Sequence, residues 1–139
     1  MKKALVLICI FLMLLSCSCG LFGPQKYVCD IEQVASIKIV RLDKYVEGEY
    51  RYEYTVLAEI RDHETFVHRL NNVKHSVNWG DPRQLDTGII VIRIDYVNQD
   101  FDLLHPSAQN FNRSGIGNYG YFFFDSEQFN SLISDYMEE

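Results

Sequence analysis

The chain begins with an unbroken apolar run and continues with shorter, periodic patterns. Residues 4–15 are twelve consecutive apolar residues. From about residue 27 onward, apolar residues recur with a period of two or of 3.6, which predicts the strands and helices of a folded domain. Between these regions, residues 17–26 (CSCGLFGPQK) contain two glycines and a proline and predict a flexible tether.

Five segments have the composition and period of β-strands: residues 35–42, 49–60, 88–97, 101–105 and 119–124. The alternation is most regular in residues 49–60. One face of that strand carries Tyr50, Tyr52, Tyr54, Val56, Ala58 and Ile60. We expect this face to lie inward, with its tyrosines beneath the helices. Residues 74–87 and 107–118 show no period and are expected to form loops.

Two amphipathic segments follow aspartates that can cap a helix, Asp62 and Asp125. Their apolar stripes comprise Phe66, Val67, Leu70 and Val73 in the first and Phe129, Leu132, Ile133 and Tyr136 in the second. Gln128, three residues after Asp125, predicts a capping box. The order β-β-α-β-β-β-α predicts an α+β domain, in which a mostly antiparallel five-stranded sheet carries two helices on one face.

The first residues have the features of an export signal, because Lys2 and Lys3 precede the apolar run and small residues follow it. The stretch Leu14-Leu15-Ser16-Cys17 resembles the lipobox of bacterial lipoproteins. This resemblance covers residues 1–17 only. It implies cleavage after Ser16 and attachment of palmitate-like acyl chains to Cys17, which anchor the protein to a membrane surface without spanning it. An uncleaved helix and an ordinary secretory signal are the two alternatives.

The resemblance divides the chain into three parts: a signal peptide at 1–16, a lipidated cysteine and tether at 17–26, and one globular domain at 27–139. It also implies a place in the bacterial cell envelope. That place is the outer membrane in a Gram-negative cell and the outer leaflet of the plasma membrane in a Gram-positive cell. Outside the cytoplasm Cys19 and Cys29 can form a disulfide, and two reduced thiols are the alternative.

The charge of the chain argues against nucleic acid as a partner. Of the 13 basic residues, 11 remain when Lys2 and Lys3 are set aside, and they face 19 acidic residues, for a net charge of −8. Nucleic-acid affinity depends on Lys and Arg at phosphates, so an acidic domain lacks that footprint. A small acidic domain suits an inhibitor of a more basic protein, and strong salt dependence of binding favours that alternative.

No residue pattern predicts catalysis, and we expect neither an enzyme nor a cofactor. His63 and His68 are five positions apart, whereas the zinc-protease helix needs histidines four apart. His68 and His75 can share a helix face, but a solvated surface is expected there rather than a metal site. The GxGxxG pattern at residues 115–120 follows a loop and enters a strand, the reverse of a phosphate-binding turn. No GxSxG is present.

Aromatic residues in the two long loops are the best candidates for a binding surface. Trp79 lies beside Asn78 and Asp81, and Phe111 lies close to Arg113. Aromatic side chains mixed with amides and charges are typical of protein contacts. We therefore expect a lipoprotein whose domain is a non-catalytic binding module for an envelope protein. An immunity or inhibitor lipoprotein is the first alternative, and an accessory of a cell-wall hydrolase is the second.

Overall fold

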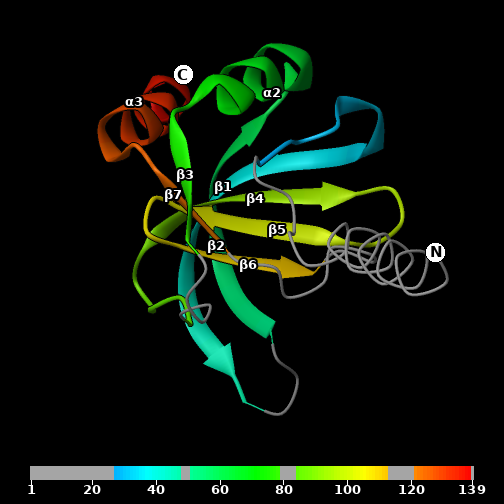
Figure 1. Ribbon diagram of the computed structural model, residues 1–139. Helices are drawn as coiled ribbons and strands as arrows, with labels where there is room; N and C mark the ends of the chain where they lie inside the picture. Colours follow the sequence, from blue (N-terminus) through cyan, green and yellow to red (C-terminus); the bar gives the residue numbers. More distant parts are fainter. Residues whose placement is uncertain (1–26, 48–50, 79–83, 113–120, 139) are drawn as a thin grey trace, which may run out of the picture.

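The computed structural model describes residues 27–47, 51–78, 84–112 and 121–138. It is an α+β fold, as the sequence predicts (Figure 1). A 3-10 turn, η2 (Ile31–Gln33), precedes the first strand. The strands are β1 (Val34–Val46), β2 (Arg51–Ile60), β3 (His75–Asn78), β4 (Ile90–Tyr96), β5 (Phe101–His105), β6 (Ala108–Asn112) and β7 (Tyr121–Phe124). The helices are α2 (His63–Asn72) and α3 (Ser126–Met137).

The main sheet has five strands in the order β2-β1-β4-β5-β6, and every neighbouring pair is antiparallel. Two details of the prediction are wrong. Residues 75–78 and 108–112 are strands rather than loops, and β7 pairs with β3 in a separate two-stranded sheet instead of joining the main one. The segments HSVN and AQNFN are short and lack apolar alternation. Their backbone partners, rather than a side-chain pattern, make them strands.

Both helices cover the same face of the main sheet. The principal core lies between the helices and that face of the sheet. The apolar stripes predicted for the helices are buried there, except that Tyr136 is only partly buried. The facing sheet residues include Ile37, Ile39, Ile92, Ile94 and Leu104, each fully buried. The small sheet adds Phe122 and Phe124 to this cluster. The core is therefore built by one sheet face, two helices and the β3–β7 ribbon.

The tyrosines of β2 lie on the opposite face of the sheet, contrary to the prediction. Ile39 pairs with Ala58 but Val40 pairs with Val56, so Leu57 is an extra residue in β2. Such a β-bulge reverses which side chains point to each face. Ala58 and Ile60 consequently join the core beneath the helices. Tyr52 and Tyr54 instead belong to a second cluster with Val40, Leu42, Leu85, Val91 and Leu103.

The caps of both helices are confirmed. The Asp62 side chain accepts a hydrogen bond from the Thr65 N–H, and Asp125 accepts one from Gln128 N–H at 2.9 Å. The predicted capping box at Gln128 is wrong, because its side-chain oxygen accepts from the Lys74 N–H at 2.9 Å. The Asp125 N–H donates to the Lys74 carbonyl. Gln128 thus joins α3 to the strand that follows α2.

Candidate functional site

The structure describes only part of the predicted partner-binding surface. Asn78 is the last residue of β3, where its backbone pairs with Tyr121, and Phe111 lies in β6 opposite Asp102. Asn78 directly precedes residues 79–83, and Tyr121 directly follows residues 113–120. The pairing of Asn78 with Tyr121 places these two points side by side. The two candidate segments therefore join the domain at neighbouring points. The remaining predicted site residues, Trp79, Asp81, Arg113, Cys17 and Cys19, lie outside the described residues.

A second region, which the sequence did not single out, is the segment that links the predicted tether to the domain. We call residues 27–33 the strap. The Tyr27 N–H donates to Nε2 of His75 at 3.1 Å. The other ring nitrogen of His75, Nδ1, lies 2.9 Å from the Val73 carbonyl, so it carries the proton and donates. One nitrogen of the His75 ring therefore holds the Tyr27 backbone at the start of the strap. The other nitrogen fixes the ring to the Val73 carbonyl.

The strap is also held at Cys29. The Asn71 side chain accepts from the Cys29 N–H at 2.8 Å and donates to the Cys29 carbonyl at 2.9 Å. The Cys29 side chain is 2% exposed, and the Tyr96 hydroxyl lies 3.8 Å from its sulfur. A disulfide between Cys29 and Cys19 stays a prediction, since Cys19 is not described.

Asp102 is the buried anchor of this region. Its side chain is fully buried, and its Oδ2 accepts hydrogen bonds from the hydroxyls of Tyr27 (2.9 Å) and Tyr96 (2.7 Å). The Tyr27 ring packs edge-on against Phe122 and Phe124. A buried carboxylate needs such donors, because its loss of hydration is otherwise uncompensated. The strap is therefore fixed to α2, β3, β4 and β5 by polar side chains inside the core.

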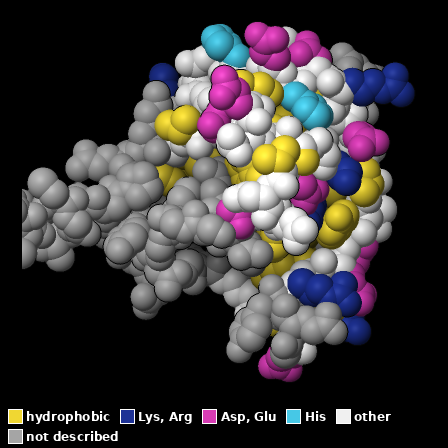
Figure 2. All heavy atoms as spheres, turned by 90° about the vertical axis from the view of Figure 1, so that its right-hand side faces the viewer, with side chains coloured by type: hydrophobic (Ala, Val, Ile, Leu, Met, Phe, Trp, Pro, Cys, Tyr) yellow, Lys and Arg dark blue, Asp and Glu magenta, His cyan; other side chains and the backbone are white. Residues whose placement is uncertain are grey.

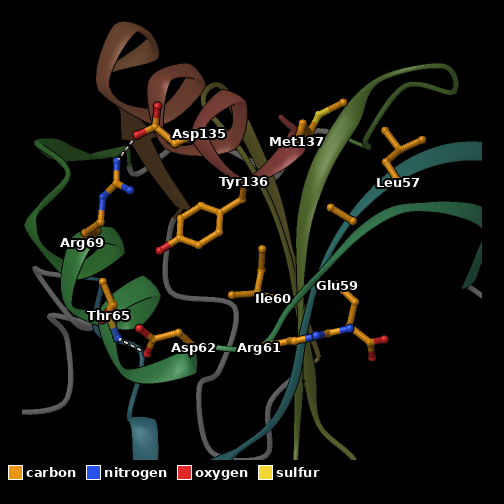
Figure 3. A pocket seen from close by; sticks show the side chains of 11 residues that line it. Leu57, Glu59, Ile60, Arg61, Asp62, Thr65, Arg69, Asp135, Tyr136 and Met137 are labelled. Atoms are coloured by element: carbon orange, nitrogen blue, oxygen red, sulfur yellow. Dashed lines mark hydrogen bonds and ion pairs between the residues drawn. The ribbon is translucent and has the colours of Figure 1, made fainter. Parts of the chain in front are cut away.

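A groove of about 740 Å³ lies between the end of β2 and the two helices (Figure 3). The Tyr136 ring occupies its middle, with Ile60 beside it, and Leu57 and Met137 form the apolar side (Figure 3). Leu57 is 37% exposed and Met137 is 44% exposed. β2 is an end strand of the main sheet, so this wall has no further strand of that sheet beyond it. The groove combines exposed apolar atoms with charged rims, as protein-binding surfaces do.

Two of the charged residues of the groove, Arg69 and Asp135, pair with each other. The Arg69 guanidinium donates to Asp135 and lies 5.6 Å from the centroid of the Tyr136 ring. The hydrogen bond to Asp135 raises the pKa of Arg69. The hydrogen bonds from the Thr65 side chain and backbone lower the pKa of Asp62.

The histidines of the described residues have structural contacts. Burial lowers the pKa of His105, and the nearby charge of Asp86 opposes this shift. Its Nδ1 lies 3.2 Å from the Ser107 hydroxyl, but the Ser107 N–H approaches the same nitrogen at 3.4 Å. This geometry is that of a local turn contact. His68 contacts Asn72 within α2. Within the described part of the chain, no cluster of three His, Cys, Asp or Glu residues could hold a metal ion.

On the face opposite the helices, a polar cluster continues from the tyrosines. Arg93 stacks between Tyr54 and Phe101, with its guanidinium carbon 5.0 Å and 4.6 Å from the two ring centroids. Its Nη2 lies 2.6 Å from Asp95, which also accepts from the Ser36 hydroxyl at 3.0 Å. Arg93 and Asp95 therefore form an ion pair on this face of the sheet.

Comparisons of the chain with protein-family models, curated proteins and solved structures find no match. The protein is therefore classified from its own structure. It is an α+β sandwich whose strap, residues 27–33, is held against the domain. Among the described residues, neither helix has the length and apolar content of a membrane span.

Proposed function

We propose that the protein is a bacterial envelope lipoprotein, anchored through lipid on Cys17, whose domain is a non-catalytic module that binds an envelope protein. The anchor is inferred from the lipobox-like residues 14–17. The distribution of exposed apolar side chains supports the binding role. Large hydrophobic residues exposed in the described structure line the groove (Leu57 and Met137) or lie in or beside the strap (Val28, Ile31 and Val97), and Val56 and Phe123 belong to neither set.

The groove is the surface we assign to the protein partner. Its apolar side chains are exposed at an end strand, where a partner can reach them, and its rims carry both signs of charge. A contact of this composition gains affinity from burying Leu57 and Met137, while the Arg69–Asp135 pair aligns the partner. The segments around Trp79 and Phe111 remain a second candidate surface.

The anchor is tested with Cys17→Ser and with Cys19→Ser as the matched control. Fatty-acid labelling and mass spectrometry of the mature chain measure the modification. We expect the Cys17→Ser precursor to stay uncleaved and unlabelled, and Cys19→Ser to be processed normally. Normal labelling of Cys17→Ser contradicts the anchor.

The partner surface is tested by placing a photo-crosslinking residue at position 57, 79 or 123 in the lipidated protein in intact cells. We expect a discrete adduct from position 57 and none from position 123, whose side chain is 42% exposed but belongs to β7, which does not line the groove. An adduct from position 79 alone assigns the partner to the other surface. Adducts from none of these positions contradict the binding role.

A further inference from the structure

We infer that the strap end of the domain is a membrane-contact surface, on which Val28, Ile31 and Val97 lie against a zwitterionic lipid headgroup region. This inference rests on the lipid anchor proposed above. It adds an orientation to that proposal: the strap end faces the membrane, and the groove is left open to a partner.

Three exposed aliphatic side chains define the surface. Val97 is 63% exposed, Val28 is 53% exposed and Ile31 is 39% exposed. Their neighbours Tyr27 and Cys29 are buried, so the strap turns alternate side chains inward and outward. Leaving three aliphatic side chains in water at one end of a small domain is unfavourable, and a contact that buries them offsets that cost.

Two contacts, one on either side of η2, hold the strap beside the end of β4, which Val97 directly follows. At one point the Tyr96 hydroxyl reaches the Cys29 sulfur, and at the other the Val97 N–H donates to the Gln33 carbonyl at 2.9 Å. In Figure 1 the blue strap runs from near the middle of the view to the right, where the turn between β4 and β5 also lies. Figure 2 faces that side and shows yellow hydrophobic side chains among magenta carboxylates.

The length of chain before the strap favours a lipid surface over other occupants. Nine residues, 18–26, lie between the predicted anchor Cys17 and Tyr27, so the segment from Cys17 to Tyr27 is ten residue steps long. Fully extended, such a segment spans at most about 33–36 Å. The exposed Val28 is one residue beyond its end. A short tether keeps the local concentration of the lipid surface high, so even a weak contact is occupied.

The charges around the patch select the kind of lipid. Asp30 and Glu32 lie in the strap among the apolar residues, and both are exposed. Asp100 lies in the β4–β5 turn. Carboxylates at a headgroup layer are repelled by anionic lipid, whereas zwitterionic lipid carries no net charge to repel them. The contact we infer is therefore with a zwitterionic surface and weakens as anionic lipid is added.

The test uses the full lipidated protein reconstituted in vesicles. Trp79 is the single tryptophan, so a Trp79→Phe background allows one new tryptophan to be introduced at a chosen position. Val97→Trp reports on the strap end, and Val56→Trp, at a residue 47% exposed on β2, is the matched control. Quenching of the fluorescence by brominated phosphatidylcholine measures contact with acyl chains. Co-flotation with the vesicles and circular dichroism measure anchoring and folding.

We expect strong quenching of the Val97→Trp protein, because an interfacial side chain lies within about 5–10 Å of the headgroup–acyl boundary. We expect little quenching of the Val56→Trp protein, and less quenching at position 97 when phosphatidylglycerol is mixed in. Equal quenching at the two positions, or none at position 97 in protein that floats with the vesicles, overturns the membrane contact and leaves the anchor standing. Protein that does not float overturns both.

Discussion

The strap and the groove both expose aliphatic side chains, but they are built differently. The strap is held by side chains buried in the core, with Asp102 fully buried and Asn71 and His75 partly so. The groove is lined in part by an exposed ion pair, Arg69 with Asp135, whose side chains are 39% and 51% exposed. Buried hydrogen-bonded groups are costly to disrupt, whereas exposed pairs contribute little. The difference indicates a rigid attachment on one side and an adaptable surface on the other.

The largest expected effect comes from removing the buried carboxylate with Asp102→Ala. This change leaves the hydroxyls of Tyr27 and Tyr96 without their shared acceptor. We expect the free energy of unfolding to fall by about 2–4 kcal/mol, since each buried donor left unpaired costs about 1–3 kcal/mol. Urea unfolding measures the loss. Asp135→Ala, which removes an exposed carboxylate of the groove, is the control, and an equal loss in both variants contradicts the contrast between the regions.

A smaller effect is expected from Asn71→Ala, which removes both hydrogen bonds to the Cys29 backbone. We expect a loss of about 1–2 kcal/mol in the free energy of unfolding. Amide exchange at Cys29 should accelerate more than exchange in β1. Asn72→Ala is matched in position and type, but among the described residues the Asn72 side chain hydrogen-bonds to His68 and not to the strap. If the two variants behave alike, Asn71 does not hold the strap.

The pH dependence of stability tests the cap that borders the groove. Hydrogen bonds from Thr65 hold the pKa of Asp62 below its ordinary value of 3.8. The stabilisation is present above that value and is lost as pH falls through the lower pKa of the folded state. Asp62→Asn keeps a capping oxygen without a titrating group. We therefore expect the urea midpoint of the variant to change less between neutral and strongly acidic pH, and an unchanged profile excludes Asp62 as a contributor.

The smallest expected effect is that of Arg69→Met on stability. The Arg69–Asp135 pair is well exposed, so we expect a change in the free energy of unfolding of at most about 1 kcal/mol. This change should shrink further in high salt, because ions screen exposed charges. Unfolding at low and high ionic strength measures both quantities. A larger loss that is insensitive to salt assigns Arg69 a packing role against Tyr136 instead.

The sequence allows much of the domain to be predicted, because its strongest signals are local. The caps at Asp62 and Asp125 depend on residues within one turn of each helix, and both were predicted. Strand β5 was also predicted, with its observed bounds at residues 101–105. Patterns that depend on neighbouring residues survive in the folded protein unless a distant contact overrides them.

The errors have distant causes. The tyrosines of β2 lie on the face opposite the predicted one because Leu57 is an extra residue in that strand. The regular alternation of the sequence gives no sign of this β-bulge. The strap was missed because its partners are far along the chain: Asn71 is 42 residues from Cys29, and Asp102 is 75 residues from Tyr27. An aspartate in the apolar strand 101–105 was the one available signal, because a carboxylate on an inward face needs buried donors.

The β-bulge at Leu57 affects the tendency of the protein to aggregate at high concentration. A long outer strand with continuous hydrogen-bonding capacity is a template on which other copies stack into fibres. An extra residue midway along β2 bends that strand and interrupts the spacing that a stacked copy would have to match. The outer strand can thus keep apolar side chains in water with less risk of self-assembly.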